Sequence, residues 1–85
     1  MIDLYIYAYP MQMITFQTVT SDGEIVTNES HAFEDVIKIT SKYLSGINPI
    51  HNIYIVGETS YADKIEFMVS NAFKHKVNIE RIRNA

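Results

Sequence analysis

The first apolar stretch of the chain alternates between two kinds of side chain. In residues 4–9 the even positions are aliphatic and the odd positions are all tyrosine. Strict alternation of this kind predicts a β-strand with two different faces. A strand that is apolar on both faces normally lies inside a sheet that is covered on both sides. We therefore expect residues 4–9 to form a central strand.

Four further runs have the composition of strands, with β-branched and aromatic residues between turn residues. They cover residues 11–20, 24–27, 51–56 and 77–82. Ser21-Asp22-Gly23 has the turn chemistry of a tight connection, because Asp can cap a bend and Gly accepts a positive φ. The first three strands are therefore predicted to form an antiparallel meander.

Two segments instead have the 3.6-residue period of an amphipathic helix. The first covers residues 31–44 with Ser30 as its predicted N-cap, and the second covers residues 61–75 with Thr59 or Ser60 as its cap. The apolar positions of the first are Phe33, Val36, Ile37, Thr40, Tyr43 and Leu44, and those of the second are Ala62, Ile65, Met68, Val69, Ala72 and Phe73. The predicted element order is β-β-β-α-β-α-β, followed by a tail at residues 83–85.

The last three elements form a βαβ unit, which joins parallel neighbours through a right-handed crossover. The simplest α/β arrangement is a mixed sheet in the order 3-2-1-4-5, in which only the second strand runs against the others. This order resembles the ribonuclease H-like fold, which actin-like ATPases, sugar kinases and Holliday-junction resolvases share. Residues 18–26 are similar to the hairpin after the first strand of sugar kinases. Residues 53–57 with Ser60-Tyr61-Ala62 are similar to the strand–glycine–helix unit of actin-like ATPases.

Both crossovers of this topology step across the sheet in the same direction, so right-handedness places both helices on one face. Members of the fold family cover the other face with later helices, for which residues 1–85 have no counterpart. We therefore expect one bare face. The parity of the strands assigns an aliphatic set to the helices, namely Leu4, Ile6, Ala8, Ile14, Phe16, Ile53, Ile55, Val77 and Ile79. It assigns Tyr5, Tyr7, Tyr9, Met13, Tyr54 and Val56 to the bare face, with Thr15 and Gln17 at its margin.

An exposed apolar patch of several hundred Å² usually marks an interface. Tyrosine and methionine are also enriched in the cores of protein interfaces. The sequence therefore predicts a partner-binding surface, occupied either by a second copy of the chain in a homodimer or by another protein. The alternative is a half-solvated face without a partner, as antiparallel sheets often have.

The composition of the chain argues against several other classes of protein, namely nucleic-acid binders, secreted proteins and membrane proteins. The 85 residues are 47% apolar and 20% charged, as expected of one globular domain, and the net charge of −3 has the wrong sign for a dedicated nucleic-acid binder. There is no cysteine, and Asp3 and Pro10 argue against a signal peptide. No run approaches the roughly 20 apolar residues of a membrane span, so we expect a cytoplasmic protein. The small size suits an accessory protein of a phage or mobile element.

No catalytic signature is complete. A ribonuclease H-like nuclease needs carboxylates around two metal ions, the first in the middle of the first strand, where this chain has Tyr7 or Tyr9. Further carboxylates could come from Glu34, Asp35 and Glu58, but the first carboxylate of the set is missing. An actin-like ATPase needs an Asp-x-Gly loop where this chain has Tyr9-Pro10-Met11, and the three histidines lack metal-ligand spacing. We expect no enzymatic activity, metal or cofactor.

One nucleic-acid hypothesis remains as the alternative function. Tyrosines on an open sheet can stack on unpaired bases, and basic residues can track the phosphate backbone. A small basic cluster lies near the end of the chain, at Lys74, Lys76, Arg81 and Arg83.

Overall fold

β1 (Ile2–Tyr7) is the central strand of a five-stranded mixed sheet in the computed structural model, which describes residues 1–83. The other strands are β2 (Ile14–Thr20), β3 (Ile25–His31), β4 (Ile50–Val56) and β5 (Asn78–Ile82). The sheet order is β3-β2-β1-β4-β5; β1 is antiparallel to β2 and parallel to β4, and β5 is parallel to β4. The predicted strand order is confirmed. Asn84 and Ala85 of the predicted tail lie outside the described residues.

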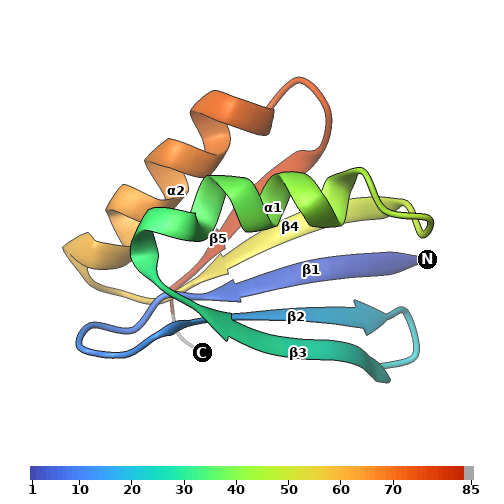
Figure 1. Ribbon diagram of the computed structural model, residues 1–85, viewed down its shortest axis with the longest axis horizontal. Coiled ribbons are helices and arrows are strands. Elements are labelled where there is room, and N and C mark those ends of the chain that lie inside the picture. Colours follow the sequence, from blue (N-terminus) through green and yellow to red (C-terminus); the bar gives the residue numbers. More distant parts are fainter. Residues whose placement is uncertain (84–85) are drawn as a thin grey trace.

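The two helices lie together on one side of this sheet (Figure 1). They are α1 (Val36–Leu44), which follows the short 3₁₀ turn η1 (Phe33–Asp35), and α2 (Ser60–Phe73). The prediction that both crossovers place their helices on the same face is therefore confirmed. Among residues 1–83, no helix is both long enough and apolar enough to cross a membrane.

The hydrophobic core fills the space between the sheet and the helices. The predicted aliphatic set is buried, with Ile79 packed at its margin, and the strands also bury Thr18 and Val56. The helices contribute Val36, Ile39 and Thr40 from α1 and Ala62, Ile65, Val69 and Phe73 from α2. Burying one large apolar side chain stabilises the fold by about 1.5–3 kcal/mol. The alternation in residues 4–9 therefore predicted correctly which half of β1 faces the helices.

The prediction of a helix from residue 31 with Ser30 as its N-cap is wrong. Ser30 lies within β3 opposite Thr15, their side-chain oxygens are 3.1 Å apart, and α1 begins only at Val36. His31 continues the strand, because its ring packs edge-on against Phe16 at 5.7 Å between centroids. Pairing with β2 thus outweighs the local helix-start signal. Thr59 does occupy the N-cap position of α2, but its side chain makes no capping hydrogen bond.

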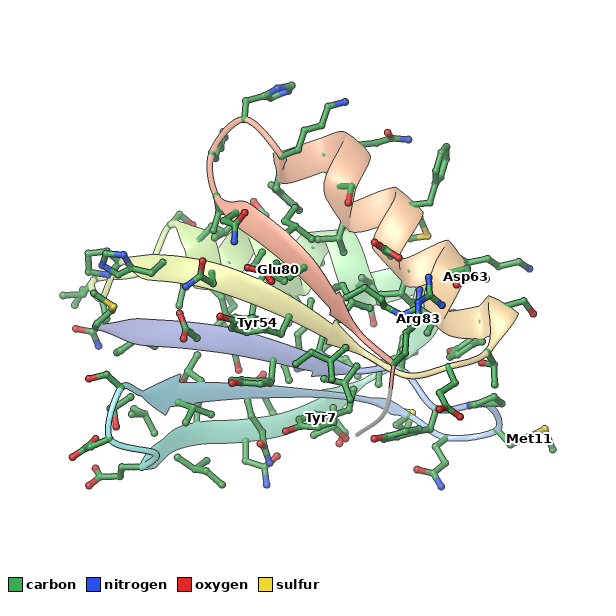
Figure 2. The ribbon with its side chains drawn as sticks, turned by 180° about the vertical axis from the view of Figure 1, so that it is seen from behind. Tyr7, Met11, Tyr54, Asp63, Glu80 and Arg83 are labelled. Atoms are coloured by element: carbon green, nitrogen blue, oxygen red, sulfur yellow. The ribbon has the colours of Figure 1, made fainter. Side chains whose placement is uncertain are left out.

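The hairpin between β1 and β2 is longer than predicted. β1 begins at Ile2, two residues before the predicted start, and β2 begins at Ile14 rather than at residue 11. Met11 has a φ of 68°, which an extended strand does not allow, so the residues around it form the turn. The turn carries Met11 fully into solvent at the end of the sheet (Figure 2).

Gly57, between β4 and α2, gives a test of this packing. Its φ is 150°, and a Cβ there would lie 2.7 Å from the Ala8 carbonyl oxygen and 2.9 Å from Ala62 Cβ. Gly57→Ala should lower the free energy of unfolding in urea by about 2–4 kcal/mol, because backbone strain adds to the clash. Gly23→Ala is the matched control: φ is 91° but no atom lies within 4 Å, so only about 1–2 kcal/mol of strain is expected. Equal losses in the two variants would contradict the close approach at Gly57.

Candidate functional site

The face of the sheet opposite the helices carries the candidate site, and we call it the open face (Figure 2). Its strand residues are those that alternate with the buried core positions. They include Asp3, Tyr5, Tyr7, Thr15, Gln17, Val19, Asn28, Ser30, Asn52, Tyr54, Val56, Asn78, Glu80 and Ile82, and Tyr9 and Met13 extend the face beyond the strand ends. The register places Tyr5 between Gln17 and Tyr54, and Tyr7 between Thr15 and Val56.

The tyrosines of the open face stack on one another. The Tyr5 and Tyr54 rings, on neighbouring strands, have centroids 4.9 Å apart and an interplanar angle of 28°. Along β1 the stack continues from Tyr5 to Tyr7 at 6.2 Å and from Tyr7 to Tyr9 at 6.3 Å. Offset stacks of this kind contribute about 0.5–1.5 kcal/mol per pair beyond burial. The rings therefore hold each other in place, and each covers part of its neighbour.

Exposure differs among the residues that sequence analysis assigned to partner binding. Tyr5, Tyr7 and Tyr54 are half-buried, whereas Tyr9 is 39% and Met13 56% exposed. Val56 is only 2% exposed, although its register partners Tyr7 and Ile82 lie on the open face. Its neighbours cover it, so Val56 supports the surface but offers a partner almost no area. The prediction that Val56 belongs to the exposed partner-binding surface is therefore wrong.

A polar ladder borders the tyrosines, and sequence analysis missed it. Asn52 Nδ2 donates to Asp3 Oδ1 at 3.0 Å, and Asn78 Nδ2 donates to Asn52 Oδ1 at 3.0 Å. Asn78 Nδ2 also donates to Glu80 Oε2 at 2.8 Å. These contacts link β1, β4 and β5 across the open face. The available signal was parity, because Asp3 and Asn52 stand two residues before Tyr5 and Tyr54 on the same strand faces.

Two phenols of the open face, those of Tyr7 and Tyr54, have a pKa above the ordinary value of tyrosine. Partial burial raises the pKa of Tyr54, and the carboxylates of Asp3 and Glu80 raise it further. Burial also raises the pKa of Tyr7, with smaller contributions from Tyr5 and Tyr9. Neutral phenol hydroxyls can both donate and accept hydrogen bonds, so this surface can bind polar as well as apolar groups.

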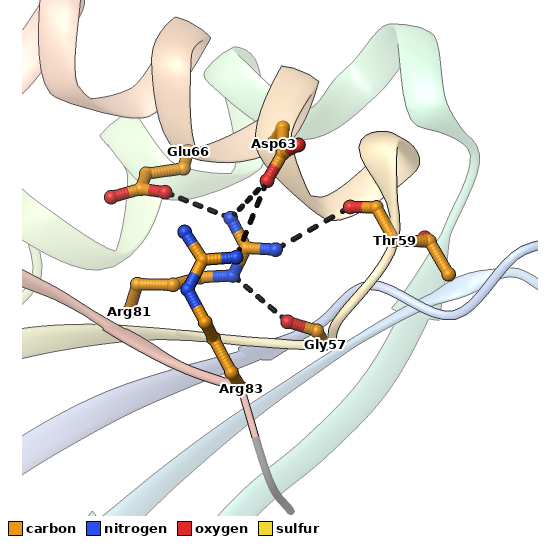
Figure 3. A network of polar contacts seen from close by, with 6 residues as sticks. All are labelled: Gly57, Thr59, Asp63, Glu66, Arg81 and Arg83. Atoms are coloured by element: carbon orange, nitrogen blue, oxygen red, sulfur yellow. Dashed lines mark hydrogen bonds and ion pairs between the residues drawn. The ribbon is translucent and has the colours of Figure 1, made fainter.

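None of the predicted basic residues occupies a strand position of the open face. Arg81 points toward α2, where its Nη1 donates to Asp63 at 2.7 Å and to Glu66 at 2.8 Å (Figure 3). Its Nε donates to the Gly57 carbonyl at 2.9 Å, which ties β5 to the start of α2. Arg83 pairs with Asp63 at 3.8 Å. These two arginines are therefore engaged in contacts within the fold.

The other two members of the cluster, Lys74 and Lys76, lie in the connection between α2 and β5, outside the strands that form the open face. The carboxylates considered for a metal site are also dispersed: Glu34 and Asp35 lie in η1, and Glu58 follows β4. Within residues 1–83, no three His, Asp or Glu side chains come close enough to hold a metal ion together.

Comparisons of the chain with protein families, with curated proteins and with solved structures gave no match. The ribonuclease H-like resemblance thus stays a prediction based on strand order and two short motifs.

The electrostatic coupling of Tyr54 to the polar ladder can be measured. In the double variant Asp3→Asn, Glu80→Gln, the pKa of Tyr54 should fall toward its ordinary value, because two carboxylates that disfavour the phenolate are lost. Titration of the tyrosine Cζ signals by NMR would show this. Tyr43, on the helix side, is the internal control: burial raises its pKa to about 12, and the substitutions should leave that pKa unchanged. An unmoved Tyr54 midpoint would rule out the coupling.

Proposed function

We propose that this chain is a small, non-enzymatic interaction module that binds a protein partner through the open face. The observation that carries the proposal is the concentration of stacked tyrosines on the face of the sheet that no helix within residues 1–83 covers. The partner is a second copy of the chain or another protein. The strand order supports a reduced ribonuclease H-like domain as the scaffold.

The open face is suited to binding because it is already ordered. Tyr5 lies on the central strand β1 and Tyr54 on its neighbour β4, and the two rings stack on each other. Association costs free energy when side chains must be immobilised, at about 0.5–1.5 kcal/mol for each rotamer-rich side chain. Tyrosine has few rotatable bonds, and stacking restricts these rings before a partner arrives. More of the contact energy is then available for binding.

The size of the face also agrees with an interface. Five strands at the usual spacing span about 24 Å, and six residues of β1 span about 20 Å, which gives roughly 500 Å² before side-chain relief is counted. A standard interface buries about 800 Å² on each partner. The exposed Met11 and Met13 of the β1–β2 hairpin extend the apolar surface beyond the strands. A partner that contacts both the sheet and the hairpin would bury an area of the standard size.

Single-stranded nucleic acid has less support as the ligand. Recognition by stacking needs ring faces that are open to bases, together with nearby cations for the phosphates. Here the rings cover one another in part, and Arg81 faces the helices.

A pair of single variants tests the proposed function. Tyr54→Ser removes a ring from the centre of the open face, and Phe67→Ser removes a 68% exposed ring from α2 on the other side. Loss of a central aromatic anchor typically costs about 2 kcal/mol of binding or more. We therefore expect Tyr54→Ser to weaken the stoichiometric complex, measured by light scattering of the purified chain and of its co-purified partner, at least tenfold.

Phe67→Ser should leave the complex intact, and circular dichroism should show unchanged helix content in both variants. Equal weakening by the two substitutions, or weakening by Phe67→Ser alone, would contradict the assignment of the binding surface.

A further inference from the structure

We infer that the partner of the open face is a cationic segment of another protein, carrying arginine or lysine side chains, and not a second copy of this chain. The inference rests on the proposed function and specifies its partner. The inference of a cationic partner is based on the distribution of charged residues between the two sides of the sheet.

None of the strand positions of the open face is a lysine or an arginine. Arg83, which follows β5, lines a pocket with Tyr9 at one end of the face and pairs there with Asp63. All seven lysines and arginines lie within the described residues. They are Lys38 and Lys42 in α1, Lys64 in α2, Lys74 and Lys76 after α2, Arg83 after β5, and Arg81. Arg81 alone lies in a strand, and its guanidinium contacts α2. The open face instead carries the carboxylates of Asp3 and Glu80, so its formal charge is negative.

These two carboxylates retain capacity to bind a cation. Asp3 accepts the Asn52 amide through Oδ1, and Glu80 accepts the Asn78 amide through Oε2. Within residues 1–83, neither carboxylate takes part in an ion pair, and no hydrogen bond uses Asp3 Oδ2 or Glu80 Oε1. The amide contacts thus position both carboxylates and leave one oxygen of each for an incoming donor.

Both carboxylates lie near Tyr54: Glu80 is directly beside it on β5, and Asp3 on β1 lies one row away, beside Asn52. The register aligns Tyr54 with Glu80 on β5 and with Tyr5 on β1, and β1 and β5 are two strand spacings apart, about 10 Å. A guanidinium group binds carboxylates through paired N–H groups and packs favourably on aromatic rings. Its aliphatic stem can also cover apolar surface. Stacked phenols flanked by carboxylates therefore match the chemistry of arginine, and to a lesser degree that of lysine.

The same charge pattern disfavours the two other occupants. A face-to-face homodimer would bury Asp3 and Glu80 of both copies, and the strand positions of the open face, all within residues 1–83, include no lysine or arginine to pair with them. Burying an unpaired carboxylate costs several kcal/mol. A nucleic acid would bring phosphates to an already negative surface, whereas its binding depends on Lys and Arg contacts.

The test uses a synthetic ten-residue peptide of alternating arginine and leucine, which presents all its arginines on one side when extended. A matched peptide replaces every arginine with glutamine. Titration of the isotope-labelled chain, followed by amide NMR shifts, should show the arginine peptide perturbing β1, β4 and β5. Its affinity should fall at least fivefold in the double variant Asp3→Asn, Glu80→Gln, and also with rising salt.

The control is Glu34→Gln, Asp35→Asn, which makes the same change in net charge at η1 on the helix side and should alter the affinity less than twofold. Equal loss in both double variants would mean that only net charge matters, and would overturn the inference. Stronger or equal binding of the glutamine peptide would overturn it as well.

Two further outcomes separate this inference from the proposed function. A dimer of the purified chain that Tyr54→Ser dissociates would overturn the cationic partner and leave the interaction function standing. Binding of the arginine peptide that maps only to the helices, together with a complex insensitive to Tyr54→Ser, would overturn both.

Discussion

The structure depends on the handedness of its two crossovers. The connections β3–α1–β4 and β4–α2–β5 step in the same direction across the sheet, and a right-handed crossover then leaves each helix on the same side. Two helices can cover only one face of a five-stranded sheet. The position of the core and the absence of a helix over the tyrosines, among the described residues, both follow from this arrangement.

β1 contributes side chains both to the hydrophobic core and to the open face. Leu4 and Ile6 are fully buried under the helices, while Tyr5 and Tyr7 stack on the open face. Since successive side chains of a strand point to opposite faces, the binding surface can change in sequence without altering the core beneath it. The Arg81 network, on the helix side, fixes α2 to β5 and keeps its positive charge away from the tyrosines. Fold stability and the proposed function thus use different side chains of the same elements.

Sequence patterns predicted the parts of the fold that depend on local periodicity. Alternation in β1 and β4 assigned the buried and open faces, and the βαβ rule gave the strand order. Ser30 was misassigned because its helix-start signal is local, whereas pairing with Thr15 and packing of His31 on Phe16 depend on residues far away in sequence. Val56 was expected to be exposed because alternation along a strand predicts the face to which a side chain points. It does not predict whether neighbouring side chains cover that side chain, as they do here.

The polar ladder and the direction of Arg81 could not be predicted for a related reason. The contact between Asp3 and Asn52 needs the register of two strands that are 49 residues apart in sequence. Arg81 was grouped with nearby lysines and Arg83 by sequence position, but strand parity turns its side chain toward Asp63 and Glu66 on α2. Once the register is known, both features follow from alternation along β4 and β5.

The most direct test of the central claim is the solvent accessibility of the tyrosine rings in the purified chain. It can be measured by NMR as relaxation from a soluble paramagnetic agent. An uncovered, monomeric open face predicts strong relaxation of the Tyr9 and Tyr54 ring protons and little effect on the Ile53 and Ile55 methyl groups beneath the helices. Protection of the tyrosine rings to the level of those methyl groups would show that the face is already covered in the purified chain, and would contradict an open face that awaits a foreign partner.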